Sequence, residues 1–465
     1  MHRLTAILLL AASTGLAEPY TLPQLIERAR NNDHRVKEAQ AQLRWFKAKY
    51  QEARWAWFPK IDSYALVGGP TPEAKNDGLG GPPTTKASYL YDLDFGQPGV
   101  MFRAGAQAVL PIYTFGKLDA LEEAGRQGVQ AGVALATRAQ DESEFQVAQA
   151  YYGYCLANSM KDVIGETIKR LDDARVTLDR LRAQGSEQVT QMDIYKLEYY
   201  KKQLEVQVVA ADAGARFALA AIRLLIGEAD DVPVQVAAEP LSEPSGFVPP
   251  MEILLSTARA HRPEIRAIEA GIAAREQEVI IRERMYLPDF GIAGFFRWAW
   301  TTNATRQVSP FAYDPYNEFT AGVGLVMAYT WDFPQKAAQL EESRAELEKM
   351  QHERDLILAG VRLEVEKAWD DTNSALLRAE KQGSAEKSSR RWAQTAFTAF
   401  DVGTGDTREL VDSFTALALS AAQKFQAWQD VQVGLCSLTK TVGQPVHLVA
   451  KADMQPPPSV APAPK

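Results

Sequence analysis

The chain has 465 residues, of which 24% are charged and 9% aromatic, and its formal net charge is −8. The negative charge argues against a nucleic-acid partner, because nucleic-acid binding requires a basic surface. Many charged and few aromatic residues are typical of long solvated helices rather than of one compact core.

The first 17 residues have the pattern of a secretory signal peptide. Arg3 precedes the apolar run Leu4–Ala12, and small residues lead to Ala17, where cleavage is expected. An N-terminal membrane anchor is the alternative, but this run is shorter than the roughly 20 residues that span a bilayer. N-terminal lipidation is not expected, because the only two cysteines are Cys155 and Cys436.

The rest of the chain contains one pattern twice. A helical period leads from Leu25 to Pro59, and the same period leads from Leu254 to Pro288. Each proline is followed by two alternating segments and then by a long helical region that is broken once. The predicted organisation is a first repeat, a linker, a second repeat and a disordered Pro-rich tail, at residues 18–231, 232–250, 251–445 and 446–465.

Four segments alternate between apolar residues and polar or small ones, as transmembrane β-strands do. They lie at residues 61–67, where the alternation is poor, and at 102–110, 290–300 and 319–331. Trp298, Trp300 and Trp331 stand at segment ends, where an interfacial aromatic girdle is expected. A soluble antiparallel sheet with one buried face would alternate in the same way, so both interpretations stay open.

If these strands span a membrane, one chain cannot do so alone. No segment after residue 17 approaches the length of a transmembrane helix, so the membrane would have to be crossed by strands closed into a barrel. About eight strands are the practical minimum for closure, and four would leave two open edges. Two copies would supply eight strands and three would supply twelve, and geometry alone does not choose between them.

The helical regions are too long for an ordinary globular domain. No proline interrupts the stretch from Lys117 to Arg182, which as a helix would be on the order of 100 Å long. The return helix carries heptad spacing from Leu204 to Leu225, and the two long regions are expected to break at residues 183–185 and 401–403. A solvated coiled-coil stalk would show the same heptads.

These features together resemble the TolC-like outer membrane efflux protein family, from about Tyr20 to Gly443. The most specific match is FDVGT at residues 400–404, which is similar to the Val-Gly-Thr turn between the family's last two long helices. The segment at residues 110–116 is similar to the family's strand-to-helix junction. The resemblance implies a mainly α protein with a transmembrane β-barrel portion: a trimer with four strands per protomer in a shared twelve-stranded barrel, continued by a long periplasmic α-helical barrel.

The implied function is an outer membrane channel, the passive exit duct of a tripartite efflux or type I secretion system in a Gram-negative cell. The implied partners are a periplasmic adaptor (membrane fusion) protein, an inner-membrane pump and outer membrane lipid. The adaptor would contact the hairpin tips, which correspond to Gly185, Val402, Gly403, Thr404 and Gly405. The alternative is a periplasmic coiled-coil structural or adaptor protein without a barrel. The cargo is not specified, so drugs, metals and secreted polypeptides stay open.

The resemblance also implies a periplasmic gate at these tips. Glu409 and Asp412 correspond to the acidic residues that ring the family's narrow entrance, and their spacing places them on one helix face. Such a ring attracts cations. A solvated acidic face at a helix start, stabilised by the helix dipole, is the alternative.

The chain departs from the family at the lock of this gate. Locked family members use a Tyr hydroxyl and an Arg near the turn, and this chain has Phe400 and Gly405 at those positions. Arg408 could substitute by reaching toward Asp193 on the other hairpin. The contacts that hold the hairpins together in the closed gate are therefore expected to be different or weaker.

No motif points to catalysis, a cofactor or a metal. The five histidines lack metal-ligand spacing, and no nucleophile elbow, phosphate loop or Cys-x-x-Cys occurs. Cys155 and Cys436 lie on helices at similar distances from their hairpin tips, so a disulfide is conceivable, with packed free thiols as the alternative.

Overall fold

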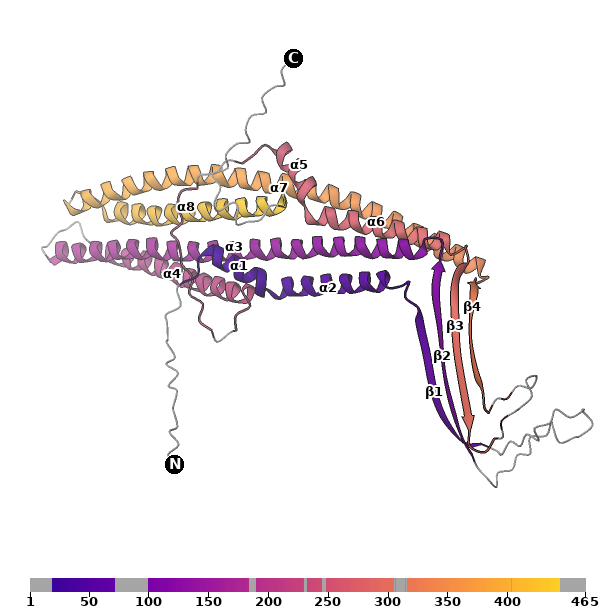
Figure 1. The fold of residues 1–465 in the computed structure, drawn as a ribbon. Coiled ribbons are helices and arrows are strands. Elements are labelled where there is room, and N and C mark those ends of the chain that lie inside the picture. The colour runs from indigo at the N-terminus through magenta and orange to yellow at the C-terminus, as the bar shows by residue number, and fades with distance from the viewer. Residues whose placement is uncertain are drawn as a thin grey trace, which may run out of the picture. The chain divides into compact units, whose positions relative to one another are not determined.

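The computed structural model describes residues 19–71, 99–183, 190–229, 232–244, 248–304, 306, 314, 316–402 and 404–443. The predicted signal peptide and tail lie outside these residues. The helices and strands of the described part follow the same order in both repeats (Figure 1). They are α1 (Leu22–Asn32), α2 (His34–Arg54), β1 (Lys60–Thr71), β2 (Gly99–Tyr113), α3 (Lys117–Ala183), α4 (Gln191–Leu225), α5 (Met251–His261), α6 (Pro263–Arg284), β3 (Asp289–Thr301), β4 (Phe319–Ala328), α7 (Phe333–Asp401) and α8 (Thr407–Thr441).

The chain forms two compact units. One comprises residues 1–43, 132–268 and 353–465, and the other comprises residues 44–131 and 269–352. We call them the helical unit and the sheet unit. The long helices α3 and α7 contribute to both.

The sheet unit contains a four-stranded antiparallel sheet in the order β1-β2-β3-β4. The central β2–β3 pair joins the two repeats, with Phe102 opposite Trp300 and Leu110 opposite Ile292. The sequence predicted a last strand that reached Trp331, and this boundary was wrong, because β4 ends at Ala328. Within the described residues, no helix combines the length and the apolar character needed to cross a bilayer.

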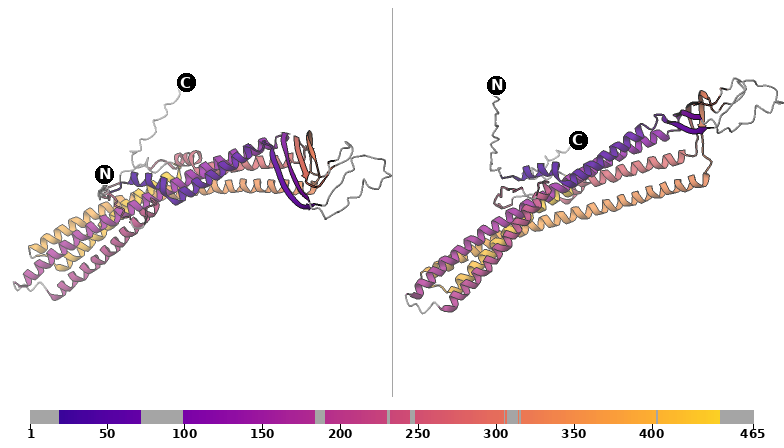
Figure 2. Two further views of the ribbon diagram at one scale, coloured as in Figure 1. Left: turned by 60° about the horizontal axis from the view of Figure 1, so that its bottom comes forward. Right: turned by 90° about the horizontal axis from the view of Figure 1, so that it is seen from below.

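The helical unit is built around two long hairpins, α3 with α4 and α7 with α8, whose partner helices lie side by side in every view (Figure 2). Apolar side chains of α1, α3 and α4 form its largest core cluster, which includes Leu25, Val147 and Ile222. Cys155 and Cys436 belong to this cluster and are free buried thiols.

Each predicted first helix is in fact two helices, and the sequence pattern did not reveal the break. Asp33 separates α1 from α2, because its carboxylate accepts a hydrogen bond from the backbone of Arg35 at 2.9 Å and so starts a new helix. Arg262 separates α5 from α6, because the following Pro263 disfavours helical geometry at the residue before it. The second helices also end earlier than predicted, at Arg54 and Arg284.

The two repeats close in the same way. Gly227 follows α4 and Gly443 follows α8, and both adopt positive φ, which favours glycine after a helix. An added Cβ at Gly227 would lie 2.8 Å from Asn32, and one at Gly443 would lie 2.8 Å from His261. Each glycine therefore lets the end of its repeat approach the helix break where the same repeat began.

Candidate functional site

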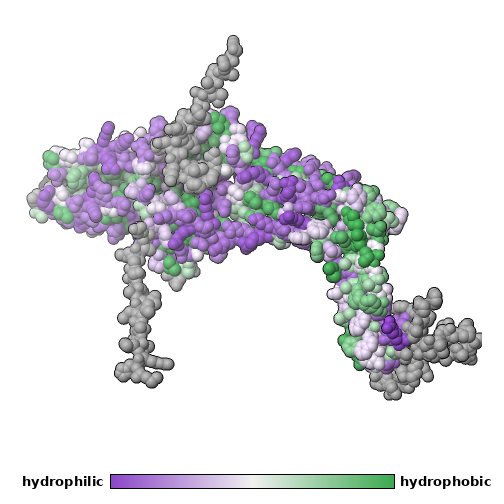
Figure 3. All heavy atoms as spheres, viewed as in Figure 1, coloured by the Kyte–Doolittle hydropathy of each residue, from purple (hydrophilic) through white to green (hydrophobic). Residues whose placement is uncertain are grey.

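One face of the sheet is mostly apolar across all four strands. The register aligns Ala65, Ala104, Trp298 and Phe319 in one row and Ser63, Ala106, Phe296 and Ala321 in another. Val323 and Leu325 on the edge strand β4 are 81% and 87% exposed. In Figure 3 the sheet is mostly green or white, whereas the long helices are mostly purple. An exposed apolar face of this extent is suited to lipid.

The opposite face of the same sheet carries the polar side chains. Asp62, Gln107 and Phe295 form one row, and Tyr64, Gly105 and Arg297 form the next. Arg297 lies 3.5 Å from Glu318. A sheet with one lipid-compatible face and one polar face has the chemistry of a wall between a bilayer and an aqueous pore.

Aromatic residues gather at both ends of the strands. Trp300 stacks on Phe102 near the end of β3, with ring centroids 5.5 Å apart, and Trp298 lies two residues before it. Trp331 lies beyond β4 and contacts Tyr329 at 4.9 Å. The sequence prediction missed Trp55, Trp57 and Phe58, which contact one another just before β1 and are all exposed. The run Trp-Ala-Trp-Phe before Pro59 was the available signal.

The tips of the two hairpins share one apolar core. Phe400 is only 3% exposed and packs with residues of all four long helices. The other buried members of this tip core are Leu171, Ala174 and Leu178 of α3, Leu197 of α4, Ala393 of α7, and Leu410, Val411, Phe414 and Leu417 of α8. The phenyl ring at this position therefore joins the hairpins by apolar packing. A tyrosine in the same place would also need a hydrogen-bond partner for its hydroxyl.

The two predicted gate carboxylates lie one turn apart on α8 and contact different partners. Glu409 accepts a hydrogen bond from the indole nitrogen of Trp392 on α7 at 2.6 Å. Asp412 lies 3.7 Å from Arg408 on its own helix. Asp412 also lines a groove between α8 and α4 together with Met192, Tyr195, Lys196, Tyr199, Tyr200, Arg408 and Val411.

In the described protomer Arg408 does not pair with Asp193, as the sequence had suggested it could. Asp193 accepts hydrogen bonds from the backbone nitrogen and the hydroxyl of Thr190, at 2.9 and 2.6 Å, and so caps the start of α4. Arg408 is 75% exposed in its side chain and pairs with Asp412 instead. A charged contact between the hairpins at this end joins Arg180 to Asp401 at 4.0 Å.

The turn at the second tip is held by its backbone. Thr404 and Gly405 both donate to the carbonyl of Ala399 at 2.9 Å. A Cβ on Gly405 would lie 2.6 Å from the backbone nitrogen of Phe400, so the turn requires glycine there. Val402, at the start of this turn, is 73% exposed. Gly185 and Gly403 lie outside the described residues.

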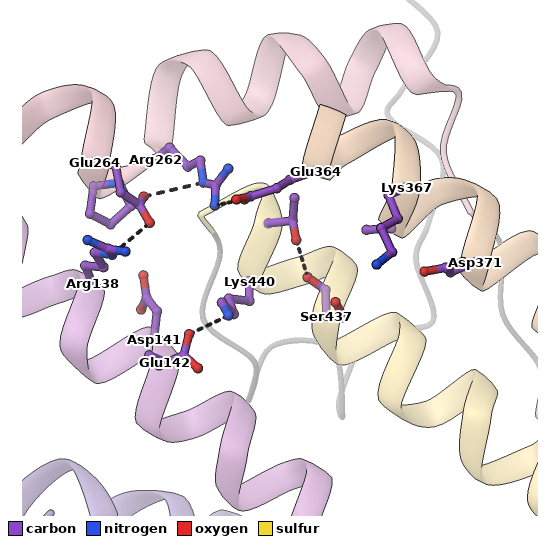
Figure 4. Close-up of a pocket in the computed structure, with 13 residues that line it drawn as sticks. Arg138, Asp141, Glu142, Arg262, Glu264, Glu364, Lys367, Asp371, Ser437 and Lys440 are labelled. Carbon is purple, nitrogen blue, oxygen red and sulfur yellow. Dashed lines mark hydrogen bonds and ion pairs between the residues drawn. The ribbon is translucent and has the colours of Figure 1, made fainter. Parts of the chain in front are cut away.

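A charged cavity of about 330 Å³ lies in the helical unit, away from the tips (Figure 4). It is lined by side chains of α3, α7, α8 and the α5–α6 break, which include Arg138, Asp141, Glu142, Arg262, Glu264, Glu364, Lys367, Asp371 and Lys440. Most of these charges are paired: Arg262 with Glu264 and Glu364, Arg138 with Glu264, and Lys440 with Glu142. The sequence pattern gave no sign of this cavity, because its residues come from distant parts of the chain.

Two neighbouring carboxyl groups in this cavity titrate in opposite directions. Burial, together with the charges of Glu144 and Glu264, raises the pKa of Asp141 to about 6. Burial also opposes ionisation of Glu142, but hydrogen bonds from Lys440 and Gln146 outweigh it and leave the pKa of Glu142 below its usual value. At neutral pH the surroundings therefore favour the ionised form of Glu142 and disfavour the ionised form of Asp141.

The two helix breaks lie at corresponding positions of the two repeats. The residue at the break is acidic in the first repeat and basic in the second. In the first repeat Asp33 is buried and pairs with Arg35 at 2.8 Å. In the second repeat Arg262 is buried and lies 3.4 Å from Glu264. Hydrogen bonds from Arg35 and Ser143 outweigh the effect of burial and hold the pKa of Asp33 below its usual value. A buried charge at each break is thus neutralised locally.

The structure does not favour chemistry at the thiols. Burial raises the pKa of Cys155 to about 11 and that of Cys436 to about 12, so both stay protonated near neutral pH. Among the described residues, no group of three or more His, Cys, Asp or Glu side chains is arranged to hold a metal ion.

The chain is similar to known proteins over nearly its whole length. Residues 25–228 and 254–444 match the family described as outer membrane efflux protein.

The fold is similar to that of the outer-membrane channel OprN, with a TM-score of 0.74 and 19% identity over 91% of this chain and 90% of that one. It is also similar to the CmeC outer membrane channel of Campylobacter jejuni (TM-score 0.73, 14% identity, 91% and 85% covered). The open state of the MtrE outer membrane channel of Neisseria gonorrhoeae gives a TM-score of 0.69 at 15% identity, with 91% and 89% covered. At these identities the likeness establishes the fold. A sequence search of curated proteins gave no significant match.

Proposed function

Because this chain belongs to the outer membrane efflux protein family, we propose that it is an outer membrane channel, the exit duct of a tripartite efflux or type I secretion system. The observation that carries this proposal is the sheet, which has an apolar face, a polar face and, within the described residues, two unpaired edges. Lipid would cover the first face and the pore would be lined by the second. The long helices would extend from the outer membrane into the periplasm.

The channel is proposed to be a homotrimer. Four strands per chain need partners for both edges, and three copies make a twelve-stranded barrel with a polar lumen. The strands of the two repeats already form one continuous sheet within the chain, which supports the same pairing between chains.

The hairpin tips are proposed to meet a periplasmic adaptor, through which an inner-membrane pump supplies energy. Val402 supports this role, because it places an exposed apolar side chain on a turn fixed by the bonds of Thr404 and Gly405 to Ala399. Gly185 and Gly403 belong to the same proposed contact. The chain itself would be a passive conduit.

The gate is proposed to combine a ring of acidic side chains with an apolar contact that holds the two hairpins together. Glu409 and Asp412 of three copies would form the ring at the narrow entrance, where six carboxylates would favour cations. Phe400 in the tip core would replace the missing tyrosine lock. Arg408, which is exposed and pairs with Asp412 on its own helix, would tie the closed state weakly.

The proposal is tested by the protein-only mass of the detergent-purified mature chain, measured by light scattering with the detergent contribution subtracted. We expect a mass of three chains and recovery from the outer membrane fraction. A soluble monomer or dimer that needs no detergent would contradict the channel and support a periplasmic coiled-coil protein. Deletion of the gene should in addition sensitise the cell to at least one exported compound, and restored export by the wild-type chain is the control.

A further inference from the structure

The buried guanidinium group of Arg262 has hydrogen-bonding capacity that the described residues do not use. Arg262 lines the charged cavity, and its side chain is only 6% exposed. Its Nη2 donates to Glu364, whereas Nε and Nη1 are buried without a hydrogen-bond partner in the described part of the chain. Nε lies 3.4 Å from Glu264 as an ion pair only. A buried charged donor without an acceptor is costly, so Nη1 is suited to an acceptor that enters the cavity.

The corresponding position of the first repeat is fully bonded. Asp33 takes the place of Arg262 there, and its two carboxylate oxygens accept hydrogen bonds from Arg35 and Ser143. Ser143 lies on α3, and the residue of α7 at the same distance from its helix end is Val361, which is buried and apolar. The second repeat therefore leaves open a position that the first repeat fills with its own side chains.

Asp141 supplies a second charge without a partner in the same cavity. No hydrogen bond or ion pair joins its carboxylate to another described residue. In Figure 4 this carboxylate points from α3 toward the break between α5 and α6. Burial and the charges of Glu144 and Glu264 raise the pKa of Asp141 to about 6, and the charges of Arg30 and Arg266 do not offset this effect. An ammonium group beside Asp141 would therefore be stabilised.

The charges of the cavity disfavour a ligand of one sign. Four basic and five acidic side chains line it, and most of them already pair with one another. A simple anion could satisfy Arg262 but would add negative charge to a site with an acidic excess. A simple cation could satisfy Asp141 but would leave the donors of Arg262 unpaired. A ligand that carries both a carboxylate and an ammonium group satisfies both residues.

We propose that this cavity binds a small zwitterion of the amino acid type, with its carboxylate on Arg262 and its ammonium group on Asp141. The ligand would lie between the two hairpins, because Asp141 belongs to α3 and the cavity is also lined by Lys367 of α7 and Lys440 of α8. All of these residues belong to the helical unit. The proposal does not depend on the proposed channel, because every contact is made within one chain.

Isothermal titration calorimetry on the detergent-purified full mature chain at pH 8 tests this proposal. The probes are glycine, β-alanine and 4-aminobutanoate, which are zwitterions that differ in the separation of their two charges. Acetate and methylammonium, which each carry one charge, are the matched probes. We expect at least one zwitterion to bind with one site per chain and a Kd on the order of 1 mM or lower. It should bind roughly tenfold more tightly than acetate or methylammonium.

Two variants test the two ends of the ligand. Asp141→Asn should weaken zwitterion binding roughly tenfold or more. Because the raised pKa of Asp141 means that its ionisation destabilises the fold, this variant should be at least as stable as wild type at pH 8. Arg262→Lys keeps the charge but removes the forked donors, and should weaken binding to a similar extent. Thermal unfolding shows whether each variant is folded.

Asp162→Asn is the matched control, because Asp162 is an exposed residue of α3 that does not line the cavity. It should leave binding unchanged. The absence of saturable binding of every zwitterion up to about 10 mM would overturn the proposal. Acetate binding as tight as that of the zwitterions, and unchanged in Asp141→Asn, would overturn it too, because the site would then take anions alone. Neither result bears on the channel, which is judged by the mass of the purified protein.

Discussion

The hairpin tips bury their apolar side chains within one chain, whereas the sheet leaves its apolar side chains exposed. At the tips Phe400, Leu410 and Phe414 are buried by four helices of the same chain. In the sheet Val323 and Leu325 stay exposed within the single chain. The tips can therefore be stable in one protomer, whereas in the proposed channel the sheet would depend on lipid and on further copies.

This difference separates the two proposed tasks of the molecule. A tip that is packed within each chain can be closed or opened by moving hairpins as units. In the proposed channel, a sheet that is completed by its surroundings would hold the protein in the membrane. Four substitutions test this separation, from the largest expected effect to the smallest.

Phe400→Ala should have the largest effect, because it leaves a cavity in the tip core. Loss of a buried Phe costs about 3–5 kcal/mol. We expect hydrogen exchange of the tip helices to accelerate accordingly, and the resting conductance of single channels to rise. Phe397→Ala is the matched control, because Phe397 is on the same helix and is 38% exposed. Equal effects of the two variants would contradict an apolar tie at Phe400.

Val323→Arg should act on the sheet and not on the tips. A charge in the middle of a lipid-facing strand costs about 2–4 kcal/mol. The amount of folded trimer in outer membranes, read from heat-modifiable mobility on gels, should fall. Gln107→Arg on the polar face, opposite Asp62, is the control and should be tolerated. If Gln107→Arg were the more harmful variant, the assignment of the two faces would be reversed.

Asp141→Asn should remove a pH dependence of the helical unit. Because the pKa of Asp141 is raised to about 6, ionisation destabilises the folded chain as pH rises from about 4 to 7. The variant should be more stable than wild type at pH 8, by on the order of 1 kcal/mol after allowance for solvent, and equal to it at pH 4. Thermal unfolding at the two pH values measures this.

The neighbouring substitution Glu142→Gln supplies the control of opposite sign. The pKa of Glu142 is lowered, so its ionised form contributes stability that is lost as pH falls. Glu142→Gln should therefore be less stable than wild type at pH 8. A stabilising effect of both substitutions would show that the charged cavity is not organised as described.

Arg408→Ala should have the smallest effect. Its ion pair with Asp412 is exposed, and such pairs contribute about 0–1 kcal/mol. We expect a small rise in resting conductance that disappears at high salt, and no change in the thermal stability of the trimer. A closed state that Arg408→Ala leaves unchanged at every salt concentration would remove Arg408 from the gate.

The sequence revealed the features that depend on local order. Alternation from residue 290 to 300 predicted β3, and the uninterrupted helical pattern after Lys117 predicted α3. The breaks near Ala183 and Asp401 were also visible, because glycine follows each of them within two residues. The break at Asp33 was missed, because a single capping carboxylate inside a helical period leaves little trace in the pattern.

What the sequence by itself determined is the order of helices and strands and the two-fold repeat, since both follow from periodicity and turn residues along the chain. Only the tertiary structure decided that Phe400 is buried among four helices, that Arg408 turns to Asp412 rather than Asp193, and that Asp141 shares a cavity with Glu264. These contacts join residues far apart in sequence, and a period carries no information about which distant helix a side chain will meet.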